Sequence, residues 1–494
     1  MTRPSILIIG GGLAGLSTGC YALANGWETT IVEHNLALGG VCTAWHRGPY
    51  TVDGCIHWLT GGPFSKIYEE LQIVPPVAIR PLTEFATIRS ARDGWSVTVR
   101  ADLQGFAGDL KALAPEDGAA IDEMIAVASR VPEIAPPIES PPELTSLGAQ
   151  LRMLWDMRHE LGTFARHRGT VGAWVSEHFK SPAARTALLG LVPPEAPALF
   201  LLMMLGYLER GWLSRPVGGT GAFRDALVAR YAALGGACRV DSTVDEVLVE
   251  RDRAVGVRLD DGTILRGDLV VSTSSAPETV LRLLGGRYGA DELRERMDTW
   301  KLFDPIVLAS WGVARSLADA PQTLSVSEVD GRVLGGRAVD RFTVRVYNDE
   351  PSIAPPGHTV VQMLVNTDYE WWATRGVRYG DAKAEFARAA LELLDPHFPG
   401  IADDVRMTDV ATPITYWRSA RTWRGAFEGW MPSADNFRTH VAKSLPGLRG
   451  FYMAGQWVEP GGGVPTALMS GRQLVQILCD AADRPFVAAP QRAR

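Results

Sequence analysis

The sequence predicts an α/β protein in which a Rossmann-like dinucleotide-binding domain is interleaved with an α+β domain. Near the N-terminus an apolar run leads directly into a glycine-rich loop, and a stretch with helical periodicity follows. Short strand-like segments with tight turns return at 217–272, and a strand, a glycine-rich loop and a helix follow at 450–479. The chain has 494 residues, more than one hydrophobic core usually organises, so two domains are expected.

The first 33 residues have the pattern of a parallel strand–helix–strand unit. Ser5–Ile9 is an apolar run of strand length, and Glu28–Val32 is a second one. Between them Leu16 and Leu23 recur at helical spacing before the chain turns at Gly26, a residue type that commonly ends helices.

The loop between the first strand and the helix predicts a dinucleotide site. It reads Gly10-Gly11-Gly12-Leu13-Ala14-Gly15, the G-x-G-x-x-G pattern. The first glycine permits the tight turn, Gly12 lets the backbone approach a pyrophosphate, and Gly15 allows close packing of helix on strand. The helix N-terminus presents free N–H groups to the phosphates. Glu33, at the end of the second strand, is placed to bind a ribose hydroxyl.

Further glycines favour FAD over NAD. Gly39-Gly40-Val41-Cys42 follows Glu33 closely, so the backbone there can pass beside a pyrophosphate and ribityl chain. Near the C-terminus Gly455-Gln456 and Gly461-Gly462-Gly463-Val464 precede a second predicted helix. Positive potential from a helix N-terminus near the N1–C2=O edge stabilises a reduced flavin. The sequence therefore predicts one FAD per chain.

The remaining elements are predicted from hydrophobic periodicity and turn residues. Residues 105–214 are expected to be mainly helical, 381–394 to form a helix, and 465–479 to form the last helix. The expected strands are 85–90 and 95–100, which form a hairpin, and 237–240, 244–250, 254–259, 269–272, 306–313, 359–365 and 450–454. Because the type of predicted element changes along the chain, we expect a discontinuous FAD-binding domain at 1–75, 215–285 and 435–485, and a substrate domain at 76–214 and 286–434.

Charge, cysteine content and hydropathy exclude several classes of protein. A net charge of −7 and a pI near 5.8 give no basic field for a nucleic-acid partner. Five scattered cysteines without a CxxC pair argue against a disulfide framework and favour the cytoplasm. No His, Cys or carboxylate cluster has metal-ligand spacing, so no metal is expected.

One apolar segment could contact an apolar substrate. Residues 198–208 are apolar on every helical face, so the segment is expected to be either a buried core helix or a wall of a substrate path. It is too short to cross a bilayer, which needs about 20 residues. A membrane-contacting entrance would make the protein membrane-peripheral.

Several stretches resemble the flavin amine oxidase superfamily, and within it the bacterial-type phytoene desaturases, carotenoid isomerases and retinol saturases. The resemblance is carried by IIGGGLAGLSTGCYALANGWETTIVEHNLALGGVCTAW, YTVDGCIHWLTGG, RPVGGTGAF, VDEVLVERDRAVGVRLDDGTILRGDLVVSTSS and GFYMAGQWVEPGGGVPTALMSGRQ. It implies noncovalent FAD, with Val244 meeting the adenine through its backbone and residues 455–464 lining the flavin. Many members carry Arg where this chain has Val41, so phosphate pairing by Arg is absent there. A flavin thioether at Cys42 is an alternative, although a buried cysteine more often serves as a small hydrophobe.

The resemblance implies hydride transfer between flavin N5 and a carbon of an apolar polyene or isoprenoid, in desaturation, saturation or isomerisation. His57, which follows Asp53-Gly54, is the weak catalytic candidate, and a structural histidine is the alternative. An amine- or alcohol-type flavin oxidase and a non-catalytic prenyl-binding protein are the competing interpretations. The electron acceptor or donor is left open.

Overall fold

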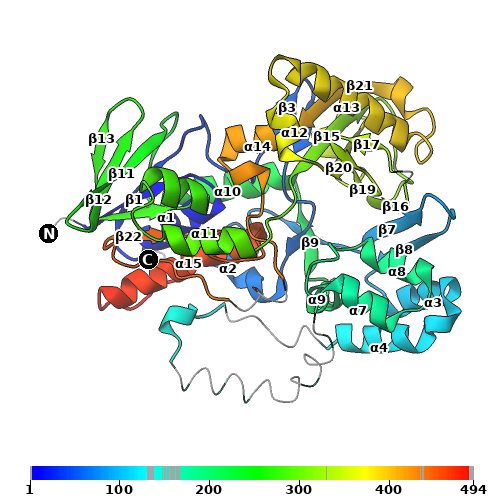
Figure 1. Cartoon of the computed structure of the whole chain (residues 1–494), viewed down its shortest axis with the longest axis horizontal. Helices are drawn as coiled ribbons and strands as arrows, with labels where there is room; N and C mark the ends of the chain where they lie inside the picture. Colours follow the sequence, from blue (N-terminus) through cyan, green and yellow to red (C-terminus); the bar gives the residue numbers. More distant parts are fainter. Residues whose placement is uncertain are drawn as a thin grey trace.

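The computed structural model describes residues 3–130, 138–146, 169–329, 331–433 and 439–488, and single residues at 148, 152, 155, 162, 167 and 436. Within these ranges the chain forms two large sheets flanked by helices, so the predicted α/β class is confirmed. In Figure 1 the sheet that contains β1 lies on one side of the molecule, together with both termini, and the sheet that contains β15 lies on the other.

A five-stranded parallel sheet forms the first of these layers. Its strand order is β10 (Ala237–Arg239), β2 (Glu28–Val32), β1 (Ser5–Ile9), β14 (Leu269–Ser272) and β22 (Phe451–Met453). Each of these strands was predicted from the sequence, although β10 and β22 are shorter than expected. The sheet thus joins three stretches that are far apart in the chain.

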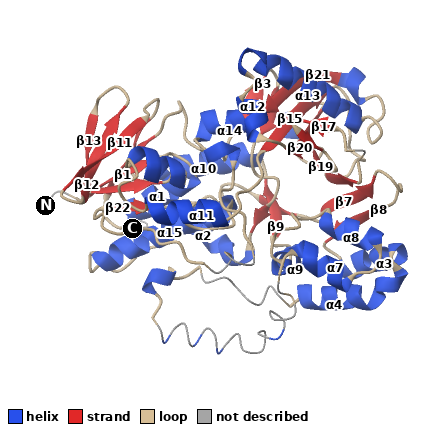
Figure 2. Ribbon diagram, in the orientation of Figure 1, coloured by secondary structure: helices blue, strands red, loops and turns tan. Residues whose placement is uncertain are grey.

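The two faces of this sheet are both covered (Figure 2). Ile6 and Ile8 of β1 belong to a core shared with three helices, α1 (Leu13–Ala24), α10 (Gly219–Ala233) and α15 (Gly463–Ala481). Leu7 and Ile9 face the opposite core, which contains β11 (Val244–Glu250), β12 (Arg253–Leu259), the single π-helical turn Glu278–Leu283 and α11 (Ala290–Thr299). Burial on both faces explains why β1 is apolar throughout rather than alternating.

The second large sheet has seven strands. Its order is β21 (Val405–Ala411), β15 (Ile306–Val313), β20 (Thr359–Asn366), β19 (Arg341–Val346), β16 (Thr323–Ser327), β7 (Glu84–Ser90) and β8 (Ser96–Arg100). Neighbours are antiparallel except β16 and β7, whose parallel pairing attaches the hairpin predicted at 85–100 to the later strands. The helices α12 (Tyr369–Ala373) and α13 (Tyr379–Leu394) supply Trp372 and Phe386 to its core.

A helical layer packs beside β7 and β8. Its helices are α3 (Leu103–Leu113), α4 (Gly118–Ala128), α7 (Val171–His178), α8 (Pro182–Leu189) and α9 (Ala198–Glu209), and they share one core with the hairpin. The helical interpretation of 105–214 is confirmed where the structure describes this range; most of 131–168 lies outside the described residues.

Several short elements were not expected from the sequence. β3 (Ala44–Arg47) and β4 (Tyr50–Asp53) form a hairpin, and β5 (Leu59–Thr60), β9 (Leu213–Pro216) and β6 (Ile79–Pro81) form a small sheet between the two large ones. The other short elements are α2 (Ser65–Glu70), β13 (Ile264–Arg266), β17 (Val333–Leu334), β18 (Arg337–Ala338) and α14 (Pro413–Ala420).

Close approach of α1 to the first strand depends on Gly15. A Cβ atom at this position would lie 2.1 Å from the carbonyl oxygen of Gly10. On another side of the same helix, a Cβ atom on Gly471 of α15 would lie 2.7 Å from the amide nitrogen of Thr18. Both contacts are too short for any side chain, so glycine is required for this packing.

Replacing Gly15 with Ala should therefore destabilise the protein by about 3 kcal/mol, at the upper end of overpacking effects. The measurement is urea unfolding of the flavin-free protein. Gly108→Ala is the matched control, because Gly108 is an exposed residue of α3 with no atom near its Cβ position. That change should stabilise the helix by about 0.5–1 kcal/mol. Equal stability of Gly15→Ala and the parent protein would contradict the packing argument.

Candidate active site

A cavity of about 1400 Å³ is lined by residues of both large sheets and of the helical layer. Pockets for a single small ligand usually measure about 300–1,000 Å³, so this one has room for two ligands or one very long one. One part is formed by the glycine loop after β1, and another by the apolar face of α9.

The structure brings almost all of the predicted cofactor residues into this cavity. Gly15 is the exception, because it is turned towards Gly10 and serves the packing of α1. The predicted residues that line the cavity are Gly10, Gly12, Leu13, Ala14, Glu33, Gly39, Gly40, Val41, Cys42, His57, Val244, Gly455, Gln456, Gly463 and Val464. Their convergence from four separate stretches is a geometric result; that they bind FAD stays a prediction.

The glycine loop has the shape that a pyrophosphate requires. Gly10 has φ +98°, which disfavours any other residue at the turn. A Cβ atom on Gly12 would meet nothing nearer than the Cα of Gly40, at 3.8 Å, so the surface there is open to the cavity. At the other end, a Cβ atom on Gly461 would project into open space. A Cβ atom at Gly12 would therefore enter this cradle without a close contact to the protein.

Glu33 is held in place by its neighbours. Its Oε2 accepts a hydrogen bond of 2.7 Å from the amide of Gly11, and its Oε1 accepts one of 2.9 Å from the amide of Asn35. Burial opposes ionisation, but hydrogen bonds from His34, Asn35 and Gly11 outweigh it and hold the pKa of Glu33 below its usual value. The carboxylate is therefore charged at neutral pH and oriented towards the cavity end where a ribose is expected.

Two arginines near this end were missed by sequence reasoning. Arg282 lines the cavity and donates a hydrogen bond of 2.8 Å to the carbonyl oxygen of Val244. Contact between Val244 and an adenine therefore has to use its N–H or the remaining lone pair. Arg421 also lines the cavity, and its Nε is buried without a hydrogen-bond partner among the described residues. Among 43 arginines in the sequence, no local motif singles these two out.

The C-terminal glycine loop is fixed on both sides. The amide of Gly455 donates to Ser470 Oγ at 2.9 Å, and Gln456 Nε2 donates to the carbonyl oxygen of Phe427 at 2.8 Å. Gly461, Gly462 and Gly463 all have positive φ, and α15 begins at Gly463. The helix N-terminus thus lies at the cavity wall, as the flavin interpretation expects.

Cys42 is buried, as the small-hydrophobe interpretation expects, but it also lines the cavity. It lies beside Cys55, and the pKa of the Cys55 thiol is raised well above its usual value, first by a hydrogen bond with Cys42 and then by burial. The pair continues the register of the β3–β4 hairpin, in which Ala44 faces Asp53.

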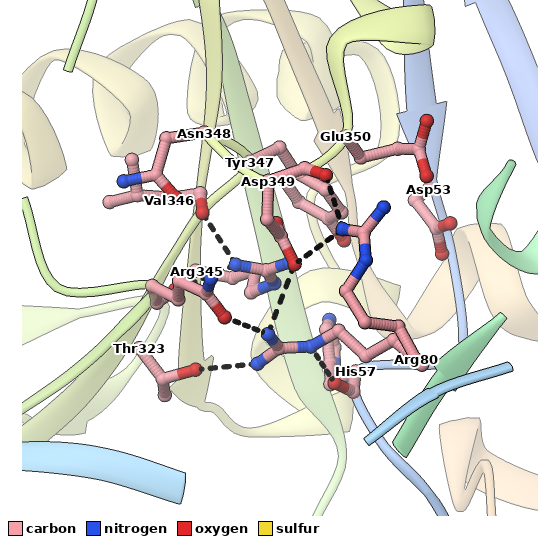
Figure 3. A network of polar contacts seen from close by, with 12 residues as sticks. Asp53, His57, Arg80, Thr323, Arg345, Val346, Tyr347, Asn348, Asp349 and Glu350 are labelled. Carbon is pink, nitrogen blue, oxygen red and sulfur yellow. Dashed lines mark hydrogen bonds and ion pairs between the residues drawn. The ribbon is translucent and has the colours of Figure 1, made fainter. Parts of the chain in front are cut away.

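His57 lines the cavity next to a network of charged residues (Figure 3). Burial, with the nearby Arg345 and Arg215, lowers the pKa of its imidazole to about 4. Its Nε2 is buried and has no hydrogen-bond partner among the described residues. His57 is therefore neutral at physiological pH, and it can hydrogen-bond to a ligand but is a poor general acid.

The network itself holds three strands together. Arg215 of β9 donates to the backbone carbonyl of His57 at 2.8 Å and to Thr323 of β16 at 3.2 Å. Asp349, just after β19, pairs with Arg345 at 2.5 Å and with Arg215 at 3.3 Å. Figure 3 shows Arg80 approaching the same carboxylate from β6. Because Asp349 pairs with all three arginines, the network ties these elements together and supports the cavity wall.

Apolar side chains line the other part of the cavity. The helix α9 has two different faces. Leu201, Leu202 and Leu205 are buried in the core, whereas Phe200 and Met203 lie on a face that lines the cavity. One face is thus a buried core face, and the other lines the cavity; that this second face belongs to a substrate path stays a prediction. The apolar lining residues include Leu82, Phe85, Leu191, Val192, Leu199, Phe200, Met203, Met204, Phe342, Leu364 and Val365.

One carboxylate in the cavity wall was also missed. Glu428 follows the short turn Trp423–Gly425, and burial raises its pKa to about 7. No charged residue is its neighbour in sequence and no motif surrounds it, so only the fold reveals it. Elsewhere among the described residues, no group of three or more His, Cys, Asp or Glu side chains could hold a metal ion. The same part of the chain contains no helix long and apolar enough to span a membrane.

Comparison with known proteins identifies the family. A family model described as flavin containing amine oxidoreductase matches residues 13–479. The chain belongs to this family. The family resemblance inferred from the sequence is thereby confirmed, and the protein is a flavin-dependent oxidoreductase.

Curated relatives of this flavin oxidoreductase include enzymes of carotenoid metabolism. The phytoene desaturase (neurosporene-forming) of Cereibacter sphaeroides is 25% identical over 514 residues, covering 96% of this chain and 94% of that protein. The chloroplastic prolycopene isomerase of Arabidopsis thaliana is 23% identical over 281 residues, covering 56% of this chain and 47% of that protein.

Solved structures of similar fold span this whole flavin oxidoreductase. An oxidoreductase from Methanosarcina mazei matches with a TM-score of 0.63 at 18% identity, covering 96% of this chain and all 100% of the other. Cyclohexylamine oxidase from Brevibacterium oxydans matches with a TM-score of 0.61 at 16% identity, covering 98% of this chain and 100% of that one. At such identities the likeness shows the fold alone.

The low pKa of His57 predicts a pH dependence of stability. Its folded pKa of about 4 lies below the ordinary value of about 6.5, so the unfolded chain takes up this proton first as the pH falls. The contribution of neutral His57 is therefore complete above about pH 6.5 and is lost as the pH falls towards 4. Between about pH 7 and pH 5 the loss should be about 2 kcal/mol.

His57→Gln should remove this part of the pH dependence, as measured by urea unfolding at both pH values. His46→Gln, the same change at an exposed position, is the control and should keep the parent slope. An unchanged slope in His57→Gln would show that the imidazole is not held neutral by its surroundings.

Proposed function

We propose that this flavin oxidoreductase binds FAD noncovalently and acts on C–C or C=C bonds of an apolar polyene or isoprenoid by hydride transfer with flavin N5. The observation that supports this proposal most directly is the continuity of the cavity, which joins the glycine cradle to the apolar chamber along α9. The relatives that are phytoene desaturases and a prolycopene isomerase support the same substrate class.

The residues present fit an FAD molecule in an extended conformation. Gly10 and Gly12 would hold the pyrophosphate with the N-terminus of α1, and Glu33 would accept hydrogen bonds from the ribose. The loop 455–464 and the N-terminus of α15 would lie along the flavin. When bound, FAD supplies the two-electron acceptor or donor for the reaction.

The chain's own contribution to catalysis is orientation and exclusion of water. An apolar chamber offers a polyene no hydrogen bonds, so van der Waals packing against residues such as Phe200 and Met203 sets which carbon approaches the cofactor. Holding the reacting atoms at near-contact distance replaces a bimolecular encounter with an intramolecular step. The same apolar walls keep bulk water from competing for reactive intermediates.

An anaerobic substrate screen tests the proposal. Phytoene, prolycopene and retinol would each be added to oxidised and to dithionite-reduced protein, with flavin absorbance and product chromatography as the measurements. Bleaching of the oxidised flavin indicates desaturation, reoxidation of the reduced flavin indicates saturation, and isomer formation without net redox change indicates isomerisation. Reaction with amines or alcohols and release of peroxide would instead support an oxidase. A colourless protein that binds prenyl chains would support the non-catalytic interpretation.

The cofactor prediction is that the purified protein is yellow, with one FAD per chain that acid precipitation releases. Gly12→Val should abolish FAD binding because its methyl groups would occupy the pyrophosphate path. Since a Cβ atom at Gly12 meets no protein atom closer than 3.8 Å, thermal stability of the flavin-free protein should be unchanged. Full flavin content in the variant would contradict the assignment of the loop. Flavin that stays with the precipitated chain, but not in Cys42→Ser, would indicate a thioether.

The two faces of α9 give a prediction about substrate access. Leu202 is 0% exposed in the core, so Leu202→Asp should lower both the stability of the fold and the flavin content. Met203 lines the cavity, so Met203→Asp should spare flavin content and melting temperature but lower turnover of a long apolar substrate at least about tenfold, since a charge in the path costs more than 1.4 kcal/mol. Full turnover in Met203→Asp would remove this face from the substrate path.

A further inference from the structure

Glu428 differs from the other carboxylates that line the cavity. Within the part of the chain that the structure describes, its carboxylate has no hydrogen bond and no ion pair, and among the cavity carboxylates only that of Asp340, which is exposed, shares this property. The cavity carboxylates that do have partners are Glu33 with Asn35, Glu195 with Lys301, Glu278 with Arg282, Asp304 with Arg337 and Glu459 with Lys443. A carboxylate without a partner in a largely apolar cavity is costly, so a structural role does not account for it.

The position of Glu428 is set by the start of α15. A Cβ atom on Gly462 would lie 2.6 Å from both the Cβ and the carbonyl oxygen of Glu428, so the two backbones are in direct contact. A Cβ atom on Gly463 would lie 3.9 Å from Glu428 Oε1, which places the carboxylate beside the first turn of the helix. The hydrogen bond from Gln456 to Phe427 fixes the preceding residue. The carboxylate therefore lies where the flavin is expected, and its backbone is held there.

Three titratable groups that line the same cavity are neutral around pH 7. They are Cys55 and His57, which follow the β3–β4 hairpin, and Tyr416 of α14. Burial raises the pKa of Tyr416, a hydrogen bond with Cys42 and burial raise that of Cys55, and burial lowers that of His57 to about 4. Burial brings the pKa of Glu428 to about 7. Among these groups Glu428 is the one that exchanges a proton near neutral pH.

We propose that Glu428 is the acid–base residue of the cavity, exchanging a proton with the substrate carbon next to the one that exchanges hydride with the flavin. This inference rests on the proposed function. In desaturation one C–H bond gives its hydrogen and electron pair to FAD, the oxidant. The neighbouring C–H bond breaks, its electron pair becomes the π bond, and its proton goes to a carboxylate oxygen of Glu428. Saturation runs the same exchange in reverse, with protonated Glu428 as the donor. General acids and bases of this kind work best when their pKa lies near the working pH.

The first test needs no substrate. Infrared spectra of the flavin-free protein would be recorded from about pH 5 to about pH 9, a range that brackets the expected midpoint. A protonated carboxyl band that titrates near pH 7 in the parent protein and is missing in Glu428→Gln is expected. Glu370→Gln is the control. Glu370 pairs at 2.7 Å with Arg424, which lies in the loop that contains Glu428, but Glu370 does not line the cavity. A band that persists in Glu428→Gln would overturn the proposal.

Stability supplies a second test without substrate. The folded pKa of Glu428 lies above its unfolded value, so the folded state is penalised as the pH rises from about 4.5 to about 7. Glu428→Gln lacks this penalty, so its melting temperature should exceed that of the parent protein at about pH 8 and match it at about pH 5. Equal melting temperatures at both pH values would overturn the proposal, since the group would then not be held protonated by the fold.

The third test uses phytoene in detergent micelles as the probe and single-turnover flavin absorbance as the measurement. Glu428→Gln should keep FAD content but slow the reaction at least about 100-fold and remove its inflection near pH 7, while Glu428→Asp should restore part of the rate and the inflection. Glu370→Gln should behave like the parent protein. An unchanged rate and pH profile in Glu428→Gln would overturn the proposal. A parent protein inert to phytoene, prolycopene and retinol would contradict the proposed function instead, and the two titrations would still decide whether Glu428 is the proton-exchanging group.

Discussion

The contact between α1 and the first strand is the constraint on which the rest of the structure depends. With no side chain at Gly15, the helix begins directly against the carbonyl oxygen of Gly10, and its N-terminus points into the cavity. The same helix is the surface on which α10 and α15 pack, so its position also determines where the C-terminal glycine loop lies. One close backbone approach therefore sets the positions of both glycine loops that line the cavity.

Much of the fold and of the cofactor site could be predicted because the signals are local. A buried parallel strand such as Ser5–Ile9 is a continuous apolar run, and a glycine loop followed by helical periodicity leaves few alternatives. Pairings between distant segments leave no such trace. β16 joins β7 in parallel, yet nothing within Thr323–Ser327 indicates its partner, and β3 and β4 lie in a stretch whose glycines suggested only a loop.

The catalytic side of the site was harder to predict for a physical reason. A residue acquires an unusual proton affinity from what surrounds it, and these surroundings are assembled from distant segments. His57 is neutral because Arg345 and Arg215 lie near it, and Glu428 holds its proton because an apolar cavity encloses it. The sequence indicated His57 as a candidate and gave no signal for Glu428, whereas in the structure the pKa of the carboxyl lies near 7 and the imidazole is neutral.

The three-part origin of the five-stranded sheet has a consequence for how this protein is made. β1 is synthesised well before β22 and α15, which complete the sheet and one wall of the cavity. β1 and β2 can pair early, but the other edge of β1 stays open until β14 and then β22 have been synthesised. A chain that ends before β22 would lack this strand, the helix α15 and one wall of the cavity.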